Sequence, residues 1–129
     1  MAAIRQATPT DAETLSALGG GTFAETFGHL YRPEDLAAFL AKSHSREAYA
    51  RLLADSSYAL WIAEEDGAPA GYCVAGPCTL PVPDMPDDAG ELARLYLYKD
   101  YHGAGLGGRM LSLSLDWLRA RFAHVYLSV

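Results

Sequence analysis

The residues best suited to binding chemistry lie in a glycine-rich turn near the end of the chain. Four glycines, Gly103, Gly105, Gly107 and Gly108, fall within six residues, directly ahead of a segment with helical spacing of apolar side chains. The N-terminus of a helix carries unpaired amides and a partial positive charge, so it favours phosphate groups. Glycine lets the backbone approach such a group without a side chain in between. The turn therefore predicts a phosphate-binding site.

Three kinds of phosphate site use such a turn, and the neighbouring residues distinguish them. A Walker loop requires Lys and then Ser or Thr after its last glycine, whereas Arg109 and Met110 follow Gly108. A dinucleotide fingerprint, G-x-G-x-x-G, fits by letter, but it belongs in the first strand-to-helix turn of a domain with an acid about 20 positions on. Here the turn lies near the end of the chain, and the next strand-like segment, VYLSV, carries no acid. The third kind of site binds coenzyme A.

The segment resembles the acetyl-CoA motif of the GNAT family of N-acetyltransferases, Q/R-x-x-G-x-G/A. The residues from His102 to Gly107 align with it, and the preceding ELARLYLYKDY resembles the fourth strand of that family. The sequence departs at His102, where Gln or Arg is usual, and at Lys99, where proline is common. A histidine can still donate to phosphate, although its charge depends on pH near about 6.5.

The resemblance implies which residues hold acetyl-CoA. Backbone groups of Leu95, Tyr96 and Leu97 would pair with the pantetheine arm as an added strand does. The pyrophosphate site would comprise His102, Gly103, Ala104, Gly105, Leu106, Gly107 and Gly108. The resemblance covers nearly the whole chain, since TFAETFGHLYRPEDLAAFL and GYCVAG resemble the PaiA-type bacterial spermidine/spermine acetyltransferases. That narrower likeness adds polyamines to the candidate acceptors.

Acetyl transfer to an amine needs a base, because an amine with a pKa of about 10.4 is mostly protonated at pH 7. Glu91 is the candidate base, since it begins a strand-like segment and the family places a catalytic glutamate at the matching position. The alternative is a solvated residue at a strand start. Alternation along a strand predicts that its carboxylate shares a face with Ala93, Leu95 and Leu97. The backbone amide of Leu97 is the candidate donor to the developing oxyanion, and no residue is assigned as the general acid.

Two groups of residues are candidates for the acceptor side. Three aromatic residues at mostly helical spacing fit either a core stripe or a pocket wall: Phe23, Phe27 and Tyr31. Three acids in a proline-rich segment fit either a solvated loop or a recruiting site for a polyamine: Asp84, Asp87 and Asp88.

Apolar periodicity predicts the elements that position these residues. The strand-like segments are Ala3–Ala7, Tyr58–Ala63, Ala70–Ala75, Glu91–Tyr98 and Val125–Val129. The helical segments are one helix or two shorter pieces around Gly19-Gly20-Gly21, one beginning at Pro33, and then Arg46–Ala54 and Gly105–Phe122. Thr10 and Glu13 have the spacing of a capping box at the first helix.

The pattern predicts an α/β (α+β) chain with the GNAT acyl-CoA N-acyltransferase fold, a mostly antiparallel mixed sheet flanked by helices. With 129 residues we expect a single domain, 1–129. The family fold normally continues past its fifth strand, so we expect truncation after HVYLSV. A homodimer or a complementing chain would then cover that edge.

Composition and spacing exclude several other classes. A net charge of −6 argues against nucleic-acid binding, which uses clustered Lys and Arg. No apolar run reaches the about 18–20 residues of a membrane span, and residues 1–25 lack the features of a signal peptide. The cysteines Cys73 and Cys78 fit a reducing cytoplasm, and no His or Cys has metal-ligand spacing, so no metal is expected.

The expected function is transfer of an acetyl group from acetyl-CoA to a primary amine by direct attack in a ternary complex. The amine belongs to a small molecule, polyamines included, or to a peptide. Two alternatives stay open: a coenzyme A-binding module without turnover, and, less favoured, a nucleotide-binding oxidoreductase domain.

Overall fold

A single five-stranded sheet organises the chain. The computed structural model describes residues 2–81 and 83–128, so Met1, Val82 and Val129, the predicted end of the last strand, lie outside the described residues. The strands are β1 (Ala2–Gln6), β2 (Ala59–Glu65), β3 (Ala68–Pro77), β4 (Ala89–Leu97) and β5 (His124–Leu127). They follow chain order across the sheet, and neighbours are antiparallel except for β4 and β5, which are parallel. The prediction of a mostly antiparallel mixed sheet is confirmed.

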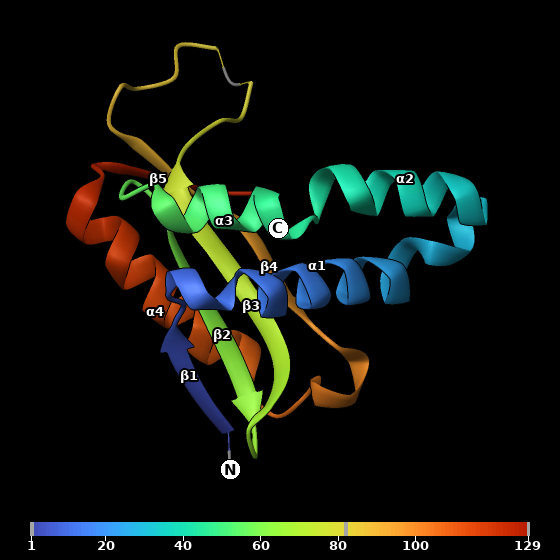
Figure 1. The fold of residues 1–129 in the computed structure, drawn as a ribbon. Helices are drawn as coiled ribbons and strands as arrows, with labels where there is room; N and C mark the ends of the chain where they lie inside the picture. Colours follow the sequence, from blue (N-terminus) through green and yellow to red (C-terminus); the bar gives the residue numbers. More distant parts are fainter. Residues whose placement is uncertain (1, 82, 129) are drawn as a thin grey trace.

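Helices cover both faces of this sheet. They are α1 (Ala12–Phe27), α2 (Pro33–Ser43), α3 (Arg46–Ala54) and α4 (Leu106–Arg121), with single 3-10 turns η1 (Pro9–Asp11), η2 (Gly28–Leu30) and η3 (Lys99–Tyr101). Helices α1 and α3 pack on one face and α4 on the other (Figure 1). Helix α2 projects beyond the sheet alongside the second half of α1, and none of its described residues is buried. None of these helices is long and apolar enough to cross a membrane, within the ranges described.

Alternation along the strands separates two apolar cores. Trp61 and Leu92 belong to the core between the sheet and α4, together with Met110 of that helix. Ile62 and Tyr72 belong to the core under α1 and α3, together with Leu15. Because successive strand residues point to opposite faces, membership of a core shows which face a side chain occupies.

The glycine run does not interrupt α1, which is one continuous helix. The run allows close packing instead, because a Cβ on Gly19 would overlap the hydroxyl of Tyr49 and lie 2.5 Å from Nδ1 of His44. The absence of a side chain there brings α1 against α3 and the segment after α2.

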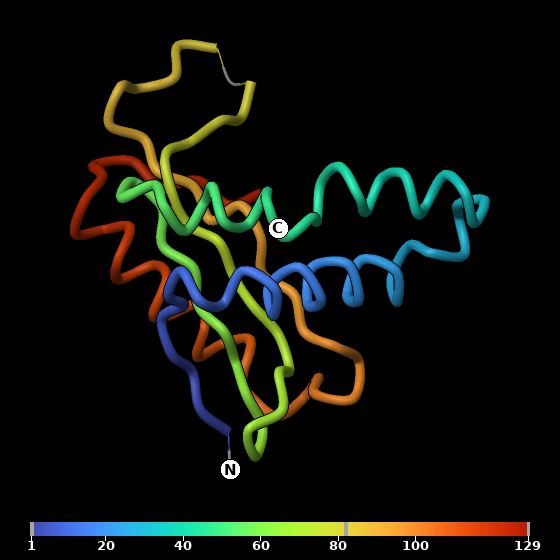
Figure 2. Tube along the Cα trace, in the orientation of Figure 1, coloured from blue at the N-terminus to red at the C-terminus, as the bar shows by residue number. Residues whose placement is uncertain are grey.

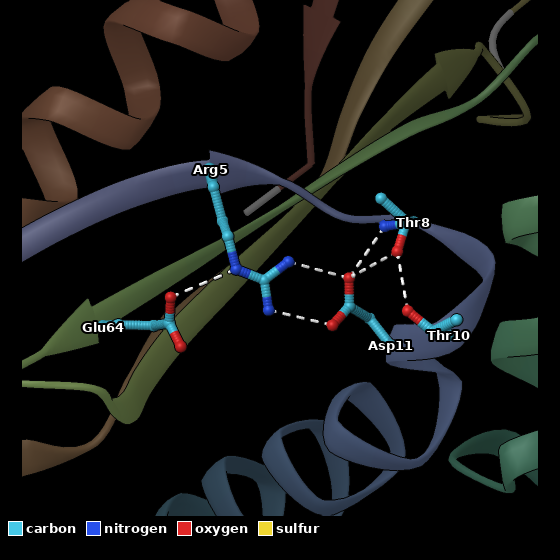
Figure 3. A network of polar contacts seen from close by, with 5 residues as sticks. All are labelled: Arg5, Thr8, Thr10, Asp11 and Glu64. Atoms are coloured by element: carbon cyan, nitrogen blue, oxygen red, sulfur yellow. Dashed lines mark hydrogen bonds and ion pairs between the residues drawn. The ribbon is translucent and has the colours of Figure 1, made fainter.

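A polar network fixes the junction between β1 and α1 (Figure 3). The Arg5 guanidinium donates two hydrogen bonds of 2.8 Å to the Asp11 carboxylate and one of 3.1 Å to Glu64. Asp11 also accepts from the Thr8 backbone N–H at 2.8 Å. The capping box predicted at Thr10 and Glu13 is therefore wrong: the box is formed two residues earlier, by Thr8 and Asp11 at η1.

Strand β4 runs from one end of the sheet to the other, between the loop after β3 and the turn before α4. Figure 2 shows the long loop after β3 projecting from one end, and the turn between β4 and α4 lying at the other. β4 therefore leads directly from that loop to the glycine-rich turn.

Candidate active site

A β-bulge at Ala93 interrupts β4. Val74 of β3 pairs with Arg94, whereas the next residue, Ala75, pairs with Leu92. Ala93 is thus the extra residue, and a bulge re-aims the side chains on either side of it. Bulges of this kind are common beside active sites.

The bulge changes which side chains share a face. Leu92, Leu95 and Leu97 all pack toward the core under α4, so the residues before and after Ala93 are out of simple alternation. Glu91 instead lines a cavity with Arg94, on the face that α1 and α3 cover. The prediction that Glu91 shares a face with Leu95 and Leu97 is therefore wrong, because simple alternation takes no account of the bulge.

Beyond the bulge, one edge of β4 has no strand partner among the described residues. Pairing with β5 runs from Ala89 to Leu92, and the last backbone hydrogen bond is from the Ser128 N–H to the Leu92 carbonyl at 3.2 Å. On the other side, the Tyr98 N–H donates to Ala70 of β3 at 3.0 Å. Since backbone groups alternate in direction, those of Tyr96 also face β3.

The same alternation directs the amides of Leu95 and Leu97 toward the open edge. Of the three residues expected to pair with pantetheine, these two present backbone groups there. The Leu97 carbonyl accepts a hydrogen bond of 3.0 Å from Nε2 of His102, which thus carries the proton on that nitrogen. His102 therefore ties the turn back to the end of β4.

The glycine-rich turn has the backbone shape of an anion-binding nest. Gly103 and Gly105 have φ of +84° and +82°, and Gly105 is the N-cap of α4. A Cβ on either residue, or on Gly108, would meet nothing within 4 Å, so no neighbouring group crowds the turn at these glycines. The first amides of α4 have no partner within the helix, and a phosphate is a suitable acceptor for them. The residues present fit the pyrophosphate of coenzyme A.

A cavity of about 240 Å³ lies on the face of the sheet that α1 covers, between α1, the end of α2 and strands β3 and β4. Its lining includes Phe23, Phe39, His44, Tyr72, Arg94 and Tyr96. Ala93 lines it too, so the bulge residue of β4 is part of the cavity wall.

Buried hydrogen bonds connect four side chains beneath the cavity. The Tyr49 hydroxyl lies 2.8 Å from Nδ1 of His44, donates to the Tyr72 hydroxyl at 3.1 Å and accepts from Arg94 at 2.9 Å. Burial lowers the pKa of His44 to about 4, with the nearby Arg94 charge acting in the same direction. Burial also raises the pKa of both tyrosines. At neutral pH, His44 and both phenols are uncharged and Arg94 supplies the positive charge.

Glu91 is held in a neighbouring cavity that Ala93 and Arg94 also line. The residue is 4% exposed, so the predicted alternative of a solvated strand-start residue is wrong. Its carboxylate accepts hydrogen bonds from the N–H and hydroxyl of Thr79, at 3.0 and 3.2 Å, and from the Ser128 hydroxyl at 2.5 Å. These donors come from the loop after β3 and the residue after β5.

The remaining candidates divide between site and surface. Phe23 lines the cavity and packs against Phe39, with ring centroids 4.6 Å apart and the ring planes tilted by 33°. Phe27 and Tyr31 are 37% and 39% exposed, so neither is a core residue. The loop acids Asp84, Asp87 and Asp88 are not among the residues that line the cavity. Over the described ranges no group of three His, Cys, Asp or Glu could hold a metal ion, and the expected absence of a metal stays a prediction.

Sequence reasoning missed His44, Tyr49 and Arg94 as site residues. They come from three separate elements, and their side chains meet only when the sheet and helices pack. One signal was present: a glycine run inside an otherwise helical pattern often marks close packing.

Comparison with known proteins agrees with this geometry. The profile of the Acetyltransferase (GNAT) family matches residues 24–129. The chain belongs to the GNAT family. By that membership it is an acetyl-CoA-dependent N-acetyltransferase. An uncharacterised N-acetyltransferase of Mycobacterium tuberculosis (strain H37Rv) is 31% identical over 113 residues, which cover 84% of this chain and 67% of that protein.

Solved structures of GNAT proteins have the same fold. PaiA N-acetyltransferase from Thermoplasma acidophilum, in complex with coenzyme A, superposes with a TM-score of 0.76 at 19% identity, covering 93% of this chain and 73% of that one. A GCN5-related N-acetyltransferase from Ralstonia eutropha gives a TM-score of 0.77 at 23% identity, covering 100% and 84%. The GNAT acyltransferase fold is therefore confirmed, whereas the PaiA-type likeness is one of fold alone.

Proposed function

We propose that this chain transfers the acetyl group of acetyl-CoA to a primary amine of a small molecule or peptide, by direct attack in a ternary complex. One observation carries the proposal. The open edge of β4 at Leu95 and Leu97 runs directly into a turn with two positive-φ glycines at the N-terminus of α4. A thioester lying along that edge would bring an acetyl group next to the cavity of about 240 Å³, which extends along β4 from Ala93 to Tyr96 and which we call the acceptor cavity.

The chain's own residues would then divide the work of binding. The backbone groups of Leu95 bind the pantetheine arm as a neighbouring strand would, while the glycine-rich turn binds the pyrophosphate. The bound cosubstrate supplies an acyl group activated as a thioester. The Leu97 amide points along the same edge and is our candidate donor to the negative charge that develops on the acyl oxygen.

Glu91 is our candidate for the base. The bulge places it on the face of the acceptor cavity, and Ala93 and Arg94 line both its own cavity and the acceptor cavity. Thr79 and Ser128 donate to its oxygens and fix the carboxylate in one orientation. From there it can accept the proton of the amine through a water molecule.

Three expectations about the molecule as a whole stay predictions: a single domain, a cytoplasmic location and a homodimer. A polyamine acceptor also stays a prediction, implied by the PaiA-type resemblance alone. The cavity offers a sharper criterion for the acceptor, taken up below.

Calorimetry with acetyl-CoA tests the cosubstrate site. Gly105→Glu puts an acidic side chain at the nest and forces a non-glycine residue to positive φ, so we expect acetyl-CoA binding to be lost. Gly67→Glu is the matched control, because Gly67 also has a positive φ of +84° and open space around it, but lies in the β2–β3 hairpin. Both variants carry the same backbone strain, of about 1–2 kcal/mol. Equal affinity in wild type and Gly105→Glu would reject the assigned site, as would tighter binding of NAD than of acetyl-CoA.

A further inference from the structure

We infer that the acceptor is a primary amine that carries a carboxylate close to the amine and an apolar or aromatic group. Arg94 would bind the carboxylate, and Phe23 and Phe39 would bind the apolar group. The inference rests on the proposed acetyl transfer and names the substrate class for that same cavity.

The first argument for this acceptor is the charge of the residues that line the cavity. None of the described residues that line it is Asp or Glu, and Arg94 is the lining residue with a formal charge at neutral pH. The chain as a whole carries a net charge of −6, so the acids lie elsewhere. A polyamine would bring several positive charges against Arg94, whereas Glu91, the carboxylate of the adjoining cavity, already accepts hydrogen bonds from Thr79 and Ser128. A carboxylated acceptor has the opposite sign at that point.

The second step is the availability of the Arg94 guanidinium. One of its nitrogens donates to Tyr49, and the guanidinium carbon lies 5.6 Å from the centroid of that ring. In the described ranges Arg94 forms no ion pair with a carboxylate within 4.0 Å. A guanidinium has five N–H donors in a planar fork, which suits bidentate binding of a carboxylate. Donors therefore remain for a ligand.

The surrounding network does not require Arg94 for its own completion. The Tyr49 hydroxyl contacts His44 and Tyr72 independently of Arg94. These contacts hold the tyrosine in place, and the tyrosine in turn orients the guanidinium. The arrangement preorganises a cation beside the cavity, which lowers the cost of binding an anionic group.

Position along β4 sets how near the carboxylate is to the reacting amine. Arg94 lies between Ala93, the bulge residue, and Leu95, whose backbone faces the open edge. Ala93 and Arg94 line the same cavity, so an acceptor held there by a carboxylate on the Arg94 guanidinium can direct a nearby amine toward the β4 edge. An α-amino acid carries the two groups close together. The neighbouring rings of Phe23 and Phe39 line the same cavity and would contact its side chain.

Matched pairs of amines test the inference through the release of coenzyme A thiol from acetyl-CoA. L-Phenylalanine is compared with phenethylamine, and L-leucine with isoamylamine, because each pair differs by the carboxylate alone; spermidine is the third arm. We expect kcat/KM to be at least tenfold higher for the carboxylated member of each pair. Arg94→Gln should bring that ratio close to one. Arg51→Gln is the control, since Arg51 is an exposed arginine of α3, and it should keep the wild-type ratio.

The outcomes separate the inference from the proposed function. Equal kcat/KM within the pairs, a preference for spermidine, or an unchanged ratio in Arg94→Gln would overturn the inference while acetyl transfer stands. If wild type releases no thiol with any amine, the proposed function fails and the inference fails with it. The wild-type ratio decides the question even if Arg94→Gln does not fold. Arg94→Lys keeps the charge without the planar fork and should give an intermediate ratio.

Discussion

Glu91 and Arg94 are the two charged side chains that β4 presents toward the acceptor side. They lie on one face because Ala93 is bulged between them, and they line adjoining cavities. Their surroundings differ, since Glu91 is buried among three hydrogen-bond donors and Arg94 keeps donors free. The difference supports our proposals that Glu91 accepts the amine proton and that Arg94 binds the acceptor.

Glu91→Gln tests the first assignment. We expect kcat to fall by about 10²–10⁴-fold with acetyl-CoA affinity unchanged, because the amide cannot accept the amine proton. Measuring kcat over a pH series separates catalysis from structure: without the base the variant depends on amine that is already deprotonated in solution, so its deficit should shrink as the pH rises toward the pKa of the amine. The control is Glu47→Gln on the exposed surface of α3. A variant with a lower melting temperature but the wild-type pH profile would show that Glu91 has a structural role only.

Asp11 gives a pH prediction at the same scale. Hydrogen bonds from Arg5 hold the pKa of its carboxyl well below the usual range. The N–H of Thr8 lowers the pKa further, whereas burial raises it by a smaller amount than Arg5 lowers it. A lowered pKa means that the stabilisation is present above about pH 3.9, the unfolded value, and is lost as the pH falls below it.

Asp11→Asn should therefore lower the free energy of unfolding at pH 7 by about 1.5–3 kcal/mol. Arg5 is partly exposed, and screening places the value toward the lower end. The difference from wild type should narrow in urea titrations as the pH falls from 4 toward 3. Asp116→Asn, on the exposed side of α4, should stay within about 0.5 kcal/mol of wild type at every pH. A constant difference for Asp11→Asn would contradict the assigned ion pair.

At the scale of elements, α1 contains three glycines that weaken the helix but allow close packing beside the cavity. Glycines weaken a helix interior, yet α1 continues through three of them because Gly19 lets Tyr49 and His44 approach the helix backbone. The hydroxyl that orients Arg94 thus depends on a residue of α1 with no side chain.

Neighbouring glycines of α1 make this testable. Gly19→Ala should destabilise the protein in spite of the better helix propensity of alanine, because its Cβ would overlap the Tyr49 hydroxyl. Gly20→Ala should stabilise it by up to about 1 kcal/mol, since its Cβ meets nothing nearer than Leu40, at 3.8 Å. Thermal unfolding of both variants measures the contrast. Equal stabilisation by the two substitutions would show that the close contact at Gly19 is unimportant.

Periodicity predicted every strand and the helices α3 and α4 to within a few residues, because burial of one face sets the spacing of apolar residues, but it left open whether α1 is one helix or two. It did not predict the bulge at Ala93, since both faces of β4 carry apolar residues and Tyr96 on one face obscures the shift from Leu92 to Leu95 on the other. Nor did it place the capping interaction, because Thr10 and Thr8 offer similar side chains and the partner of Asp11 lies on another element. The glycine-rich turn was predictable because its residues are consecutive. The acceptor cavity was not, because it combines α1, the end of α2, β3 and β4.

At the scale of the whole molecule, the sheet separates two chemical surfaces that meet at one strand. The open edge of β4 and the N-terminus of α4 offer backbone amides to an anionic cosubstrate, while the face under α1 offers a cavity with a single cationic side chain. The bulge is where both surfaces come together. Transfer between two substrates is the activity that this arrangement supports.

Amine-dependent release of coenzyme A thiol from acetyl-CoA tests that claim most directly. The account predicts release by the wild-type chain when an acceptor amine is present and negligible release without one. It also predicts loss of release in Gly105→Glu, with release retained in Gly67→Glu. Binding of acetyl-CoA with no release on any amine would contradict the account and would indicate a coenzyme A-binding module without turnover.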